Sequence, residues 1–111
     1  MRSIGHFIGG KEVQGNSGRT ADVFEPMTGD VQAKVALASK ADVRAAVENA
    51  KAAQGEWAAT NPQRRARVMF KFLELIAKET DSLAALLSSE HGKTIPDAKG
   101  VFEMAKSLCG K

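Results

Sequence analysis

The spacing of apolar side chains changes at Ser39, and this change limits the fold more than any other feature of the sequence. Before it, alternate positions of the segment Val31–Leu37 are apolar, which is typical of a strand buried on one face. After it, apolar residues recur every three or four positions, as on one side of a helix. The sequence therefore predicts an α+β fold, with β-hairpins over residues 1–38 followed by three to four helices over residues 39–109.

The strand region begins with a small hairpin. His6–Ile8 and Lys11–Val13 flank Gly9–Gly10, a pair that can adopt the positive φ angles of a tight turn. Ala21–Phe24 is extended in character until Pro26, which cannot donate a ladder hydrogen bond. We expect these strands to be too short to form a sizeable core by themselves.

The first helix is predicted to start at Ser39, which is a good N-cap. Asp42 follows at the spacing of a capping box and favours the positive end of the helix dipole. Trp57 extends the apolar face beyond Gly55, where we expect it to anchor packing rather than bind a ligand. The rest of that face consists of Val43, Ala46, Val47, Ala50 and Ala53.

A second helix is predicted near Thr60, which has capping-box spacing to Gln63, with Pro62 in the first turn. The stretch Glu79–Ser82 predicts a break, with a third helix starting at Thr80 or Asp81. Two apolar sets mark these helices: Met69, Phe72, Leu73 and Ile76, widened by Val68 and Leu75, and then Leu83, Leu86 and Leu87.

Gly92 suits the left-handed residue that ends a helix, and Thr94 with Asp97 repeats the capping spacing at the start of a last short helix. Its apolar face contains Val101, Met104, Ala105 and Leu108.

Composition excludes several classes of protein. The 111 residues allow one small domain or part of a larger one, and 43% apolar with 26% charged residues is ordinary for a globular protein. No apolar run reaches the 18 or so residues of a membrane span, and a net charge of +3 does not by itself predict nucleic-acid binding. A single cysteine and an N-terminus without signal-peptide features lead us to expect a cytoplasmic protein.

Two glycine-bearing patterns fail as nucleotide sites. Gly92–Thr94 has the Gly-Lys-Thr ending of a phosphate-binding loop, but Leu87 stands where that motif needs its first glycine, and a helix rather than a strand precedes it. No Gly-x-Gly-x-x-Gly fingerprint occurs. We interpret the segment as a helix end followed by a helix start.

The candidate catalytic residues have simpler structural explanations. His6 and His91 lack metal-ligand spacing, and His91 suits the negative end of a helix. Cys109 has only Lys106 as positive surroundings, so we interpret it as an ordinary buried or free thiol. The cluster Arg64, Arg65, Arg67 and Lys71 reads as a solvated or ion-paired helix face. We assign no catalytic, cofactor-binding or metal-binding residue to this sequence.

Read in order, several segments resemble the start of the aldehyde dehydrogenase superfamily. There a hairpin, an Asn-Pro-x-Thr-Gly-Glu turn and a Ser-x-x-Asp-Val helix start follow one another, and the similarity extends from about Ile4 to Gly100. Ser88–Gly100 is most similar to the CoA-acylating methylmalonate-semialdehyde dehydrogenases. Glu25 replaces the commoner asparagine, and the similarity fades after Gly100. The matching segments are Phe7–Val13, Glu25–Val31, Ala38–Val47, Trp57, Arg64–Ala66 and Gly92–Thr94.

The resemblance implies that residues 1–111 are a single partial domain, the N-terminal portion of the family's cofactor-binding α/β domain. It also implies an enzyme that oxidises a semialdehyde with NAD, through a thioester on a catalytic cysteine that CoA then accepts. In that family the nucleophilic cysteine, the oxyanion-stabilising asparagine and the cofactor-binding glycines lie beyond the matching stretch, and Cys109 does not occupy the nucleophile's motif. We therefore expect no bound cofactor in this chain alone, although NAD and CoA are implied for the full-length family.

Three functions stay open. We favour a truncated aldehyde dehydrogenase that is active only as part of a longer chain and whose apolar helix faces, left uncovered, cause self-association or low stability. The second is a non-catalytic interaction module that binds a full-length relative. The third, a weak basic nucleic-acid binder, requires salt-sensitive binding. We expect no membrane partner.

Overall fold

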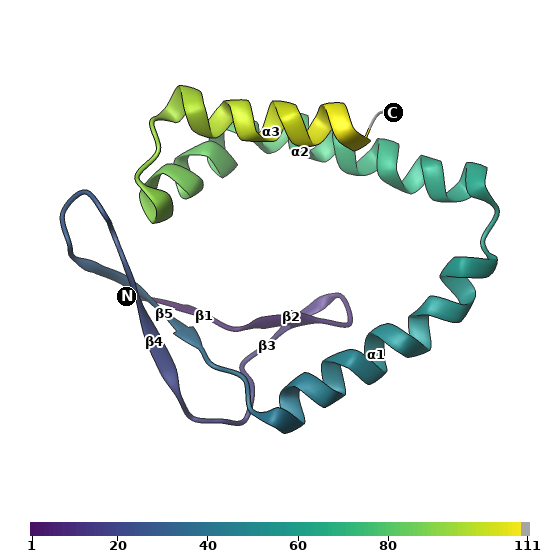
Figure 1. Ribbon diagram of the computed structural model, residues 1–111, viewed down its shortest axis with the longest axis horizontal. Coiled ribbons are helices and arrows are strands. Elements are labelled where there is room, and N and C mark those ends of the chain that lie inside the picture. The colour runs from purple at the N-terminus through teal and green to yellow at the C-terminus, as the bar shows by residue number, and fades with distance from the viewer. Residues whose placement is uncertain (110–111) are drawn as a thin grey trace. The chain divides into compact units, whose positions relative to one another are not determined.

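The computed structural model describes residues 1–109, in which five short strands precede three helices (Figure 1). The α+β fold predicted from the change in apolar spacing is confirmed. The elements are β1 (Arg2–Ile4), β2 (His6–Ile8), β3 (Lys11–Val13), β4 (Thr20–Phe24), β5 (Val31–Ala36), α1 (Lys40–Ala59), α2 (Pro62–His91) and α3 (Ile95–Cys109).

The strands form two small sheets. β2 and β3 make the predicted antiparallel hairpin, and the turn residues Gly9 and Gly10 have φ of 64° and 78°. In the other sheet β5 lies between β1, which is parallel to it, and β4, which is antiparallel. Ala33 lies at the middle of β5 opposite Arg2 and Val23, and it is fully buried.

The chain divides into two compact units. The first contains Met1–Phe24 and Gly29–Ala59, and therefore all five strands and α1. The second contains the turn Glu25–Thr28 and the chain from Thr60 onward, and therefore α2 and α3.

The predicted break at Glu79–Ser82 is wrong, because α2 runs without interruption through this stretch. The hydroxyl groups that suggested a helix start are used inside the helix. Thr80 Oγ1 donates to the Ile76 carbonyl at 2.7 Å, and Ser82 Oγ donates to the Glu79 carbonyl at 2.9 Å. Hydroxyls bonded to the preceding turn are compatible with a continuing helix.

The start of α2 is also corrected. Asn61, rather than Thr60, is the N-cap, and its side-chain oxygen accepts a hydrogen bond from the Gln63 amide at 2.8 Å. Asparagine is among the strongest N-cap residues, and the following Pro62 has no amide hydrogen that needs a partner.

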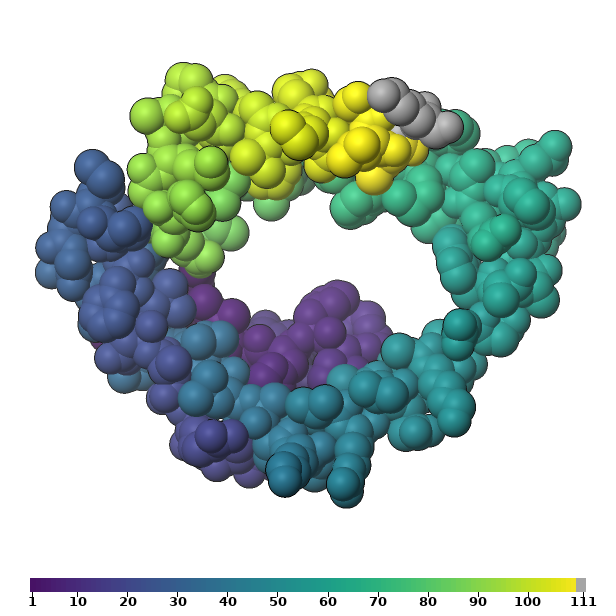
Figure 2. Space-filling model, viewed as in Figure 1, coloured from purple at the N-terminus to yellow at the C-terminus, as the bar shows by residue number. Residues whose placement is uncertain are grey.

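The core of the second unit lies between α2 and α3. Ile76, Ala84 and Ala98 are buried, the last two completely. Figure 2 shows the light-green atoms of the later part of α2 in contact with the yellow-green atoms of α3. The small alanine side chains allow the helices to approach closely.

Gly92 ends α2 in the predicted left-handed conformation, with φ of 82° and its amide donating to the Ser88 carbonyl at 2.8 Å. A Cβ atom at this position would lie 3.1 Å from Cγ of Pro26. The β4–β5 turn therefore packs directly against the end of the helix.

Candidate functional site

The most polar cluster of the first unit surrounds Asp42 at the start of α1. Its Oδ2 accepts hydrogen bonds from the Ser39 amide at 2.8 Å, the Ser39 hydroxyl at 2.7 Å and the Asn16 amide at 3.3 Å, while Oδ1 accepts from Asn16 Nδ2 at 3.4 Å. The Asp42 amide in turn donates to Ser39 Oγ at 3.1 Å. This exchange is the capping box predicted from the sequence.

The same contacts hold Asp42 in its charged form. Hydrogen bonds from the Ser39 amide and hydroxyl and from the Asn16 amide lower the pKa of Asp42 below its ordinary value, with a smaller contribution from His6, while burial opposes them. Only 8% of its surface is exposed. A carboxylate whose lone pairs are occupied in this way suits helix capping and is a poor general base.

His6 lies beside this carboxylate, close to the loop that follows β3. Its Nε2 is buried and has no hydrogen-bond partner among the described residues. A Cβ atom on Gly15 would lie 2.8 Å from His6 Nε2 and 3.5 Å from Asp42 Oδ2, and Gly15 has φ of 75°. The loop can therefore close over the imidazole only because this residue is glycine.

An open cleft of about 700 Å³ runs between the β2–β3 hairpin and the start of α1. Its walls combine apolar and amide side chains with the ring of His6 and the carboxylate of Asp42. Among the described residues that line the cleft, Asp42 is the one acid, and its oxygens accept hydrogen bonds from Ser39 and Asn16. Its lining includes Ile8, Lys11, Val13, Gln14, Asn16 and Asn49.

The segment Gly92–Thr94 does not fit a nucleotide phosphate. It connects two helices, as the sequence predicted, whereas a phosphate-binding loop follows a strand. Two of its oxygens accept hydrogen bonds: the Lys93 carbonyl from Ser88 Oγ at 2.6 Å, and Thr94 Oγ1 from the Asp97 amide at 3.3 Å. His91 is exposed on the last turn of α2, where a positive charge is favourable.

Cys109 is a partly exposed free thiol at the end of α3. The one cation that sequence spacing placed near it, Lys106, forms an ion pair with Glu103 instead. The charge of that lysine is therefore already paired with a carboxylate.

The arginine cluster lies at the start of α2. Arg64 and Arg67 line a shallow cleft of about 290 Å³ with Asn61 and Gln63, whereas Arg65 is half-buried and its Nε has no hydrogen-bond partner among the described residues. The cluster is therefore split between an exposed and a partly covered side of the helix.

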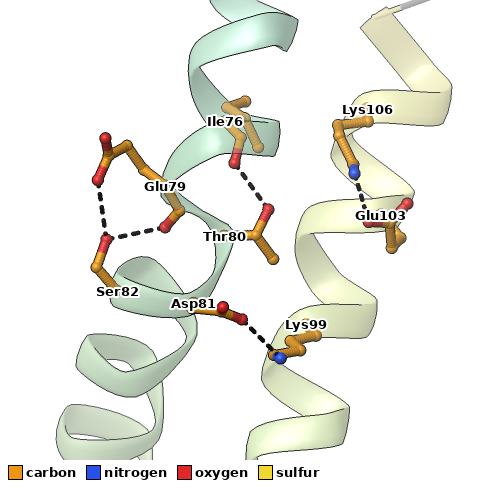
Figure 3. A network of polar contacts seen from close by, with 8 residues as sticks. All are labelled: Ile76, Glu79, Thr80, Asp81, Ser82, Lys99, Glu103 and Lys106. Carbon is orange, nitrogen blue, oxygen red and sulfur yellow. Dashed lines mark hydrogen bonds and ion pairs between the residues drawn. The ribbon is translucent and has the colours of Figure 1, made fainter.

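Sequence reasoning missed the polar contacts between α2 and α3 (Figure 3). Asp81 Oδ1 lies 2.6 Å from Lys99 Nζ, and this hydrogen bond and charge lower the pKa of Asp81. The two residues are 18 positions apart on different helices, so no local spacing could have indicated the pair. It is exposed and joins the helices; it forms no reactive centre.

Within residues 1–109 no group of three or more histidine, cysteine or acidic side chains could hold a metal ion. None of the helices in this part of the chain combines the length and hydrophobicity needed to cross a bilayer.

Comparisons with known proteins give a consistent result. Residues 13–109 match the model of the aldehyde dehydrogenase family. A malonate-semialdehyde dehydrogenase from Pseudomonas aeruginosa is 41% identical over 100 residues, which make up 90% of this chain and 20% of the relative. The chain thus spans about a fifth of the length of the curated relatives it matches.

Solved structures agree with the sequence comparison. A protein from Sinorhizobium meliloti, assigned as a methylmalonate-semialdehyde dehydrogenase and crystallised with NAD, matches 99% of this chain with a TM-score of 0.96 and 58% identity. Methylmalonate-semialdehyde dehydrogenase from Oceanimonas doudoroffii matches 99% with a TM-score of 0.95 and 37% identity. This chain covers 22% of each.

Proposed function

This chain belongs to the aldehyde dehydrogenase family, and we propose that it serves as the N-terminal segment of an NAD-dependent, CoA-acylating malonate- or methylmalonate-semialdehyde dehydrogenase. The observation that carries the proposal is the joint similarity in sequence and structure to the Sinorhizobium meliloti protein, over nearly the whole of this chain. Because the two segments share a fold and 58% identity, we expect this chain to replace its counterpart in that protein.

In this proposal the segment supplies structure, and the reacting groups come from the remainder of the enzyme. Bound NAD would accept the hydride from the substrate, and a cysteine outside the matching segment would form the thioester. In this proposal the carboxylate of Asp42 and the thiol of Cys109 take no part, because Ser39 and Asn16 hold the carboxylate and Lys106, one helical turn before the thiol, is paired with Glu103.

The test is a fusion protein in which this chain replaces the matching segment of the Sinorhizobium meliloti protein. We expect the fusion to reduce NAD with malonate semialdehyde or methylmalonate semialdehyde, and to form the CoA thioester when CoA is present. This chain alone should reduce no NAD under the same conditions. A folded fusion without activity, beside an active parent protein, would refute the proposal.

The second candidate is a non-catalytic module that binds a full-length relative. The exposed apolar side chains of α1 and α2, such as Val47 and Phe72, favour it because such surfaces mark interaction sites. Two results together would favour this role over the first. The tagged chain should co-purify with an intact relative, and it should not change NAD reduction by a relative from which the matching segment has been removed.

A further inference from the structure

One ring nitrogen of His6 lies in a closed position that the fold leaves without a partner. Nε2 is buried and makes no hydrogen bond among the described residues. The loop Gln14–Asn16 covers it, because a Cβ atom on Gly15 would lie 2.8 Å from Nε2 and 3.0 Å from Cδ2 of the same ring. Whether Nε2 can reach water therefore depends on this loop, which we call the Gly15 loop.

The Gly15 loop is held less firmly than the chain that follows it. The next residue is anchored, since the Ser17 hydroxyl donates to the Leu37 carbonyl. Asn16 contacts Asp42 at 3.3 Å through its amide and at 3.4 Å through Nδ2, and both distances are longer than a usual N–H···O hydrogen bond. The loop can therefore open without moving the anchored segment after it.

Asp42 keeps its place whether the Gly15 loop is closed or open. The Ser39 amide and hydroxyl donate to its Oδ2 at 2.8 Å and 2.7 Å, and all of these groups lie at the start of α1. These bonds are the main cause of the lowered pKa of Asp42, so its carboxylate stays charged at neutral and mildly acidic pH. Its attraction for a protonated His6 is therefore present in both states of the loop.

Two other charged side chains lie on the neighbouring strand β3. Lys11 lines the same cleft as His6, whereas Glu12, the next residue, points to the other face of the hairpin. The Gly15 loop itself contains no charged residue. Lys11 opposes the attraction by Asp42, and it too stays in place when the loop opens, because it belongs to the β2–β3 ladder. The charges around His6 are thus nearly the same in both states.

Protonation of His6 gives Nε2 a hydrogen that the closed loop cannot satisfy. Both ring nitrogens of an imidazolium are donors, and a buried charged donor without a partner is less stable than a neutral nitrogen in the same place. We propose that His6 is a proton-driven switch, which opens the Gly15 loop when it is protonated and thereby releases Asn16 from Asp42. Gly15 and Asn16 line the cleft beside α1, so acidification changes the wall of that cleft.

The test is NMR spectroscopy of the 111-residue chain between about pH 8 and pH 5, the range in which histidine changes charge. In the closed loop an α proton of Gly15 lies against the His6 ring, so the two should show a nuclear Overhauser effect (NOE) at the upper end of this range. As the Cε1 proton shift of His6 reports protonation, we expect this NOE to fall about fivefold or more. The NOE between Ser39 and the Asp42 amide should change less than about twofold, because the cap stays charged.

His6→Gln keeps a polar side chain and removes the titration, so the Asn16 amide shift, which moves with pH in the wild type, should stay constant. His91 is exposed and provides the reference shift of a histidine that no loop covers. Three results overturn the proposal: an NOE that persists after His6 is protonated, an imidazole that stays neutral throughout, or the same pH response of Asn16 in His6→Gln. The first two need only the wild-type chain, so the test decides even if the variant fails to fold.

Discussion

The charged form of Asp42 stabilises the fold more than the protonated form does, so the stability of the protein should depend on pH. The pKa of Asp42 is lowered in the folded chain by hydrogen bonds from Ser39 and Asn16. A depressed carboxyl pKa stabilises the fold at pH values above the unfolded value of ~3.9, and this contribution is lost as the pH falls through the folded pKa. We therefore expect Asp42→Asn to lower the urea midpoint at neutral pH.

The difference between the wild type and Asp42→Asn should shrink as the pH is lowered below about 4. Urea unfolding followed by circular dichroism across this range measures it. Glu48→Gln is the matched control, because it removes one negative charge from α1 at an exposed position away from the cap. A difference that stayed constant down to the lowest pH would show that the charge of Asp42 is unimportant.

Gly15 offers a second prediction at the level of single residues. Gly15→Ala and Gly18→Ala both place a side chain at positive φ, 75° and 66°, and this costs each about 1 to 2 kcal/mol. Only the Cβ atom at position 15 meets another group, His6 Nε2 at 2.8 Å; at position 18 nothing lies within 4 Å. Gly15→Ala should therefore be more destabilising by about 1 to 3 kcal/mol.

Denaturant unfolding of the two alanine variants measures that difference. The cost of alanine at positive φ is common to both variants, so the difference between their free energies of unfolding reports the contact with His6 alone. Equal losses of stability would mean that the loop moves away from the imidazole without cost.

The residues around Asp42 show what a sequence can reveal at this scale. The pair of Ser39 and Asp42 was predicted because capping depends on a spacing of three residues along one chain segment. The contact of Asn16 was not predicted, because Asn16 lies 26 positions earlier and only the tertiary structure brings it close to the same carboxylate. The proximity of His6 and Gly15 has the same non-local origin.

At the scale of the helices, the N-cap of α2 can be tested directly. Asn61→Ala removes the acceptor of the Gln63 amide and should lower the free energy of unfolding by about 1 kcal/mol. Asn61→Asp keeps an acceptor at the same place and should cost much less. Urea unfolding of both variants provides the measurement, and similar losses for the two would contradict the capping role.

The helices also show where prediction from spacing fails. The start of α1 after Ser39 and the end of α2 at Gly92 followed from local chemistry, a capping box at the first and the αL position at the second. The continuity of α2 did not, because hydroxyl residues favour a helix start in isolation and yet bond backwards to Ile76 and Glu79 within a long helix. Packing against α3, including Asp81 with Lys99, favours the continuous helix, and sequence spacing contains no information about it.

At the scale of the whole chain, the fold leaves some apolar side chains of α2 exposed and buries others. The residues of the predicted apolar set lie on one side of the helix but are unevenly covered. Ile76 is buried, but Phe72 and Leu75 have 49% and 47% of their surface exposed, and Val68 has 54%. The periodicity of the sequence showed that these residues share a wide apolar face. How much of that face α3 covers depends on the tertiary structure, which the periodicity does not contain.

Exposed apolar residues on this side of α2 lead us to expect self-association of the isolated chain. Val68, Phe72 and Leu75 recur at helical spacing, and their burial between two copies removes apolar area from water. We expect sedimentation velocity to show a larger species that grows with protein concentration. Phe72→Glu, which places a charge among these three residues, should shift the population toward monomer.

Glu74→Lys is the control for this experiment, since Glu74 is exposed and pairs with Lys71 away from Phe72. It changes the charge of α2 by two units and should leave the association state nearly unchanged, because the attraction is apolar and exposed ion pairs contribute little. A wild-type chain that sediments as a monomer at every concentration, with a cooperative melt at high temperature, would mean that the chain itself covers this side of α2. Association that Phe72→Glu leaves intact would place the contact on another surface.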